Sequence, residues 1–125
     1  MSNPFVHVEL NSNNLGKAQA FYGKLFDWKT QDTSLASGQY TTIDVGKGTG
    51  GGMNAHQLPG EQHSTWLPYV EVDDVKAATK KAISLGGTVI KDVTEIPDMG
   101  VMSIICDPTG ANLGLWQPKS TQRAS

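Results

Sequence analysis

Two titratable side chains near the amino terminus are the first candidates for chemistry. His7 and Glu9 alternate along an apolar segment, residues 5–10, which predicts a strand with both side chains on one face. Imidazole titrates near neutral pH, so His7 is a candidate catalytic acid or base and a candidate hydrogen-bond partner for a ligand. The alternative is a histidine that a neighbouring group holds in place and that does no chemistry.

A second set of polar side chains lies on residues 66–72, which also read as a strand. Tyr69 and Glu71 alternate there, and we expect them to share with Glu9 the inner faces of two strands. An inward carboxylate must be solvated, paired or hydrogen-bonded, because burying it bare is strongly unfavourable. These groups therefore either contact a polar ligand or lie at the wet mouth of a cleft.

Large side chains elsewhere could line an apolar pocket. Aromatic rings offer a flat ligand a large contact area, and methionine adapts to irregular shapes. Trp116 alternates with Asn112 and Gly114, so these three are expected to face the same way. The alternative for each ring is core or dimer-interface packing. The candidates for this pocket are Tyr40, Met53, Trp66 and Trp116.

The remaining reactive side chains have structural interpretations. Asp107 opens the segment DPTG, residues 107–110, whose composition is typical of a turn. His56 and His63 flank a polar loop, which predicts a surface position. Cys106 is the single cysteine, so it excludes an intrachain disulfide, fits a reducing cytoplasm and is interpreted as an inert thiol.

The apolar spacing predicts two helices and eight strands. The helices cover residues 15–26, capped by Asn13 or Asn14, and 75–85, capped by Asp73 or Asp74. The inner stripe of the first helix is predicted to contain Leu15, Ala18, Tyr22, Leu25 and Phe26. The predicted strands are residues 5–10, 28–31, 39–45, 51–56, 66–72, 88–96, 101–106 and 112–116.

The order strand, helix, three strands occurs twice, with an offset of 60 residues between Leu15 and Val75. Module one covers about residues 5–56 and module two about 65–118, within a single domain of residues 1–125 that ends in a frayed tail, 119–125. The predicted fold is α+β, with both modules forming one curved mixed sheet around a cleft and the helices outside. A ferredoxin-like sandwich is the alternative, but it leaves at least two strands unexplained.

A glycine-rich segment, residues 48–52, interrupts this pattern. It is either a flexible connector or a strand whose glycines leave room for another group. It lacks the lysine-serine ending and the following helix of a phosphate-binding loop.

Composition excludes several classes of function. The 125 residues carry a net charge of -2 and no basic block, which argues against nucleic-acid binding. The apolar runs are far shorter than the ~20 residues that span a bilayer, and the amino terminus does not resemble a signal peptide. We therefore expect a soluble cytoplasmic protein.

Three stretches of the chain resemble a known superfamily. HVELNSNNLGKAQAFYGKLFDW (residues 7–28) and YVEVDDVKAATKKAISLGGTVI (residues 69–90) are similar to the openings of two vicinal oxygen chelate modules, and CDPTGANLGLWQP (residues 106–118) is similar to the closing turn and strand. This is the superfamily of glyoxalase I, bleomycin-resistance proteins and extradiol dioxygenases. The resemblance implies the two-module fold, a small-molecule ligand between the modules and a homodimer.

The resemblance also implies four positions for metal ligands, on the first and last strands of each module. They are His7, Leu67, Gly114 and either Gly52 or Met53. Only His7 has a side chain that can coordinate a metal, whereas a catalytic site of this kind needs about three protein ligands. No cofactor is therefore predicted, and a divalent metal held with only His7 of the four family positions stays as the alternative.

Two functions remain open from the sequence. The first is binding of a small organic molecule in the cleft without a catalytic metal, as in the bleomycin-resistance branch. The second is an enzyme, either a lyase or isomerase that depends on His7 or on a metal, or a dioxygenase of the same superfamily. Whether there is turnover stays open, with His7 as the catalytic candidate. The predicted ligand-binding residues are His7, Glu9, Tyr40, Met53, Leu67, Tyr69, Asn112, Gly114 and Trp116.

Overall fold

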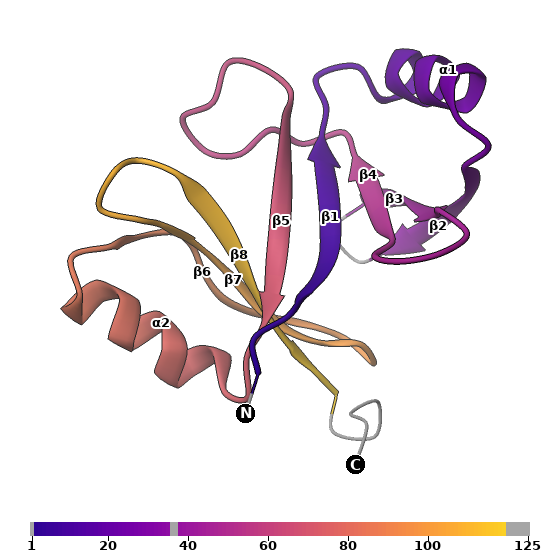
Figure 1. The fold of residues 1–125 in the computed structure, drawn as a ribbon. Helices are drawn as coiled ribbons and strands as arrows, with labels where there is room; N and C mark the ends of the chain where they lie inside the picture. Colours follow the sequence, from indigo (N-terminus) through magenta and orange to yellow (C-terminus); the bar gives the residue numbers. More distant parts are fainter. Residues whose placement is uncertain (1, 36–37, 120–125) are drawn as a thin grey trace. The chain divides into compact units, whose positions relative to one another are not determined.

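The computed structural model describes residues 2–35 and 38–119. The chain divides into two compact units, residues 6–67 and residues 1–5 with 68–125. Each unit contains one helix and antiparallel and parallel strand pairs (Figure 1). The α+β class and the repeated order strand, helix, three strands are confirmed.

The first unit is built from β1 (Phe5–Asn11), α1 (Leu15–Leu25), β2 (Lys29–Leu35), β3 (Gly38–Asp44) and β4 (Gly51–Asn54). Its strands follow the order β2-β3-β4-β1, with β4 parallel to β1 and the other pairs antiparallel. Asn14 begins the helix, because its side-chain oxygen accepts a hydrogen bond from the Lys17 N–H at 3.1 Å. One of the two predicted caps is therefore confirmed.

The core of this unit lies between the strands and α1. Leu10, Ile43 and Met53 are buried there, and partly buried side chains from α1 and its flanks pack against them. The predicted helix stripe is correct in its first half only: Leu15, Ala18 and Tyr22 join the core, whereas Leu25 and Phe26 are 56% and 43% exposed. Phe26 has extended backbone at the end of the helix, and its ring packs on Trp28 at 4.7 Å between centroids.

The second unit contains β5 (Thr65–Glu71), α2 (Val75–Ser84), β6 (Thr88–Ile96), β7 (Gly100–Cys106) and β8 (Asn112–Pro118), although residues 65–67 at the start of β5 belong to the first unit. Its strand order is β5-β8-β7-β6, with β5 parallel to β8. This repeats the order of the first unit, as the 60-residue offset predicts. Asp74 caps α2 by accepting from the Ala77 N–H at 3.1 Å.

The turn at residues 107–110 has the structural role expected of it. Oδ1 of Asp107 accepts hydrogen bonds from the backbone and the hydroxyl of Thr109 and from the Ala111 N–H. Gly110 takes a positive φ of 103°, which glycine adopts without the steric cost of a Cβ. These bonds hold the β7–β8 connection.

The interpretation of the glycine-rich segment as a strand applies to its last two residues, Gly51 and Gly52. Gly46 and Gly48 have positive φ in the turn before β4. Gly51 belongs to β4 itself, where a Cβ would collide with the Val8 carbonyl of β1. The segment is therefore a turn followed by a closely paired strand. That strand ends at Asn54, two residues before the predicted end, while β2 continues past residue 31 to Leu35.

Among the described residues, no helix is long and apolar enough to cross a membrane.

Candidate functional site

The face of the first unit that points away from α1 carries a connected group of polar side chains. Nε2 of His7, on β1, lies 2.7 Å from the hydroxyl of Tyr40, on β3. That hydroxyl donates to Oε1 of Glu9 at 3.2 Å. All three residues are half-buried, so the group is in contact with solvent rather than enclosed in the core. We call these three residues the His7 relay.

The direction of the hydrogen bonds in the relay follows from its chemistry. An ionised carboxylate only accepts, so the one hydroxyl proton of Tyr40 points to Glu9. His7 must then donate its Nε2 proton to the Tyr40 oxygen. In the neutral ring this leaves the lone pair on Nδ1, which makes Nδ1 the basic atom of the imidazole.

Burial favours the neutral form of this imidazole. Desolvation lowers the pKa of His7 below its ordinary value of 6.5, because a charged ring would lose water without full compensation. At neutral pH His7 is therefore an uncharged group that can accept a proton. Its ring also lies nearly parallel to the Tyr40 ring, with the centroids 6.4 Å apart.

Gly52 makes room for the relay. It lies on β4 between β1 and β3, opposite Glu9 on one side and Thr42 on the other. A Cβ at this position would collide with the ring of Tyr40. The tyrosine thus fills the space above the glycine, and this packing directs its hydroxyl toward β1.

Two asparagines extend the polar face beyond the relay. Asn11 follows Glu9 on the same side of β1, and its Oδ1 accepts from Nδ2 of Asn54 at 3.1 Å. The orientation of Asn54 is fixed, because its own Oδ1 accepts from the His56 N–H at 2.8 Å. Asn54 must therefore use its Nδ2 to donate to Asn11, which identifies the accepting atom of Asn11 as Oδ1 and the other end as Nδ2. This Nδ2 is buried without a hydrogen-bond partner in the described part of the chain.

The sequence analysis did not single out Asn11. Asn11 is only 3% exposed, and an unpartnered buried donor such as its Nδ2 is unfavourable by about 1–3 kcal/mol. The signal that could have identified it is the strand period itself, since His7, Glu9 and Asn11 alternate on one face.

Met53, a predicted ligand contact, and Trp66, a further pocket candidate, lie on the helix side of their strands, apart from the relay. Met53 is fully buried in the core against α1, on the opposite face of β4 from Gly52. Leu67 is 1% exposed and offers only hydrocarbon. Trp66, considered for the same pocket, packs edge-to-face on Tyr22 of α1, with 5.5 Å between the ring centroids. Met53 and Trp66 therefore do not reach the His7 relay, because strand alternation directs both to the helix side, whereas Leu67 follows Trp66 on β5 and points to the other face of that strand.

The remaining predicted contacts lie together in the second unit. Tyr69 is buried and pairs with Gly114, where a Cβ would collide with the tyrosine ring. Trp116 lies over Gly100 in the same way. Asn112, at the start of β8, pairs with Cys106. A tyrosine ring above a last-strand glycine is thus a feature of both units.

The residues at the expected metal positions do not fit a metal ion. Gly52 and Gly114 have no side-chain donor atoms, and the tyrosine rings above them occupy the space that a ligating side chain would need. Met53, the alternative to Gly52, faces the helix. No group of three or more His, Cys, Asp or Glu residues is placed to hold a metal ion among the residues that the structure describes.

The loop histidines and the cysteine have the positions expected of them. His56 and His63 are exposed on the segment between β4 and β5. Cys106 is half-buried, and its thiol lies 3.6 Å from the Asp107 carbonyl oxygen.

The chain belongs to the glyoxalase/bleomycin resistance protein/dioxygenase superfamily, whose family model matches residues 5–115. The resemblance inferred from the sequence is thereby confirmed.

Relatives within the superfamily have diverse names. The chain is 36% identical over 115 residues to "Putative glyoxylase CFP32" of Mycobacterium tuberculosis, covering 88% of this chain and 44% of that protein. It is 29% identical over 123 residues to the anthracycline biosynthesis protein DnrV of Streptomyces peucetius, covering 87% of this chain and 45% of that protein. The chain thus spans about half the length of the curated relatives it matches.

A solved structure gives the same fold. A hypothetical protein of Bacillus halodurans is similar with a TM-score of 0.72 at 12% identity, over 100% of this chain and 99% of that one. At this identity the likeness concerns the fold alone.

Proposed function

We propose that this protein binds a small organic molecule at the His7 relay, without a catalytic metal. The observation that supports this proposal is the chain of hydrogen bonds from His7 through Tyr40 to Glu9 on a half-buried strand face. Such a face combines polar groups of fixed direction with partial exclusion of water, and a few polar groups placed in this way orient a ligand in small-molecule sites.

The chemistry of the relay restricts the ligand. The imidazole of His7, the hydroxyl of Tyr40 and the carboxyl of Glu9 place three polar groups on one face, so a ligand with hydrogen-bonding groups is favoured over a purely apolar one. The glycines and the leucine at the positions implied by the family supply no ligating side chain, which supports binding without a metal. Placement of the ligand in a cleft between the two modules stays a prediction.

The names of relatives suggest the first compounds to test. DnrV is named for anthracycline biosynthesis and CFP32 as a glyoxylase. We therefore choose daunorubicin, a cationic anthracycline, and the hemithioacetal of methylglyoxal and glutathione. Binding is measured by titration calorimetry and by the shift in Tm, since a ligand that binds only the folded state stabilises it.

The expected result is that daunorubicin raises Tm and that His7→Ala and Tyr40→Phe each weaken its binding about tenfold, the loss of one good hydrogen bond. Tyr22→Phe is the matched control, because Tyr22 packs in the α1 core, away from the relay. If neither compound changes Tm, or if the control loses as much affinity as Tyr40→Phe, the proposed site is wrong.

A second candidate function is isomerisation or elimination with His7 as the base. The lowered pKa of His7 and its orientation by the Tyr40 hydroxyl favour this reading. Turnover of the hemithioacetal that survives EDTA and disappears in His7→Gln would support it. Turnover that EDTA abolishes would instead indicate a metal enzyme, and EDTA-sensitive oxygen uptake with a catechol would indicate a dioxygenase.

The remaining expectations about partners belong to the same proposal. We infer a homodimer in the cytoplasm that does not bind nucleic acid, from the family resemblance, the single cysteine and the net charge of -2. Sedimentation equilibrium tests the dimer, and a gel-shift assay with mixed-sequence DNA and RNA tests the absence of nucleic-acid binding.

A further inference from the structure

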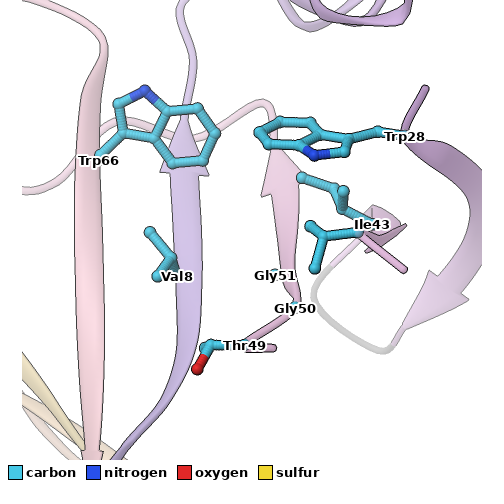
Figure 2. A pocket seen from close by; sticks show the side chains of 8 residues that line it. Val8, Trp28, Ile43, Thr49, Gly50, Gly51 and Trp66 are labelled. Atoms are coloured by element: carbon cyan, nitrogen blue, oxygen red, sulfur yellow. The ribbon is translucent and has the colours of Figure 1, made fainter. Parts of the chain in front are cut away.

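A hollow lies on the other side of the strands that carry the His7 relay. It occupies about 260 Å³ within the first unit. Figure 2 shows two indole rings, Trp28 and Trp66, at one end and Thr49 at the other, with Val8 and Ile43 between them. The lining residues are Val8, Trp28, Ile43, Val45, Thr49, Gly50, Gly51 and Trp66.

The backbone of β4 keeps this hollow open. Gly51 pairs with Val8, and a Cβ at Gly51 would collide with the Val8 carbonyl, so the close approach of the strands requires glycine there. Next to it, a Cβ on Gly50 would lie 3.1 Å from the Ile43 carbonyl oxygen. Two successive residues without side chains therefore form one wall, and nothing from β4 fills the space above them.

The two tryptophans give the hollow a rigid aromatic end. Their rings are 6.3 Å apart between centroids, with 79° between their planes. Trp66 is also held by Tyr22, and Trp28 by Phe26. In spite of these contacts Trp66 remains 39% exposed, so part of its ring can still contact another molecule.

The size and lining define the class of ligand. An apolar cavity of about 150 Å³ holds one benzene ring, so 260 Å³ suits a fused pair of rings. The lining carries no charged side chain, so an ionised ligand would lose water without compensation. Edge-to-face contact with indole further favours a flat aromatic over a saturated ring system.

We propose that this hollow binds a neutral bicyclic aromatic compound, in the size class of naphthalene or indole. The site is distinct from the His7 relay, because Val8 and Ile43 point to the α1 side of their strands while His7 and Tyr40 point to the other side. One face of the first unit thus recognises polar groups, and the opposite face takes a flat apolar ring.

The three tryptophans of the chain supply a direct test. Each indole N–H gives its own signal in a two-dimensional ¹H–¹⁵N spectrum, and Trp116 lies in the other unit. Titration with 2-naphthol should shift the Trp28 and Trp66 signals and leave Trp116 in place. Decahydro-2-naphthol, which is not flat, and 2-naphthalenesulfonate, which is charged, should each bind at least about tenfold more weakly than 2-naphthol.

Variants show whether 2-naphthol binds in this hollow or at the His7 relay. Val8→Phe fills the space and should abolish the shifts, while Val93→Phe, a matched change in the other unit, should leave them intact. Thr49→Phe, at an exposed position on the rim, serves if Val8→Phe does not fold. His7→Gln should change the naphthol affinity by less than about twofold.

Three results would overturn the proposal. These are no shift of either hollow tryptophan at millimolar 2-naphthol, equal shifts of all three tryptophans, or equal affinity for the sulfonate. A naphthol affinity that falls with His7→Gln but not with Thr49→Phe would place the compound at the relay instead. That outcome would leave the relay as a binding site and reject the hollow.

Discussion

The ring of Tyr40 fills the space that a Cβ atom on Gly52 would need. The two residues lie on neighbouring strands, and their packing directs the tyrosine hydroxyl toward His7 and Glu9. The candidate site therefore depends on the absence of a side chain at one position.

Gly52→Ala tests this dependence. The added methyl group must push the Tyr40 ring aside, so we expect a loss of about 1–3 kcal/mol in the free energy of unfolding, as for other overpacked sites. Gly23→Ala is the control, because a Cβ there meets open space on α1 and alanine favours a helix by about 0.5–1 kcal/mol. Urea unfolding should give opposite signs for the two variants, and equal signs would contradict the packing described above.

Tyr40→Phe removes the central group of the relay and keeps the ring. His7 and Glu9 each lose a hydrogen bond in a half-buried position, so we expect a loss of about 1–2 kcal/mol. Chemical denaturation measures this loss, with Tyr22→Phe as the matched control. A wild-type stability in Tyr40→Phe would show that the relay is not formed in solution.

The pH dependence of stability should report His7. The pKa of His7 is below 6.5 in the folded protein, so the unfolded chain binds more protons as the pH falls through that region. The contribution of His7 to the free energy of unfolding is then fully present above about pH 6.5 and decreases at lower pH. His7→Gln should flatten the stability profile below that pH, while the exposed His63→Gln should not. An unchanged profile in His7→Gln would contradict the burial of this imidazole.

Asp107 should be important for stability and unimportant for binding. Hydrogen bonds from Thr109 and from the Ala111 amide lower the pKa of this carboxyl below its usual 3.8. The stabilisation of the folded state by the ionised carboxyl is therefore present above that pH and is lost as the pH falls below it. Asp107→Ala should lower Tm at pH 7, with a smaller difference from wild type near pH 3. Exposed Asp27→Ala should leave Tm unchanged, and any effect of Asp107→Ala on ligand affinity would contradict a purely structural role.

The buried hydroxyl pair under α2 offers a further test. Thr79 donates to the Val75 carbonyl at 2.6 Å, so Ser103 must donate to Thr79, 2.8 Å away. Thr79→Val leaves the Ser103 hydroxyl buried without that partner, at a cost of about 1–3 kcal/mol. The double variant Thr79→Val/Ser103→Ala should recover part of this loss, and strictly additive losses in urea unfolding would contradict the pairing.

The sequence by itself determined the elements and their repetition. Alternation placed His7 and Glu9 on one face of a strand. Short polar side chains marked each helix start to within one residue, and the structure selected Asn14 and Asp74 from the two pairs. These signals are local, because strand alternation and helix capping depend on residues that are only a few positions apart in the sequence. The same is true of the turn at Asp107.

Only the tertiary structure decided which distant residues meet. Tyr40 reaches His7 because β4 lies between β1 and β3, and the register places glycine rather than Met53 under the tyrosine ring. A shift of one residue would exchange the two faces, so adjacent positions such as 52 and 53 cannot be told apart from spacing alone. Trp28 and Trp66 meet for the same reason: long-range strand pairing, and no local pattern, brings their rings to one hollow.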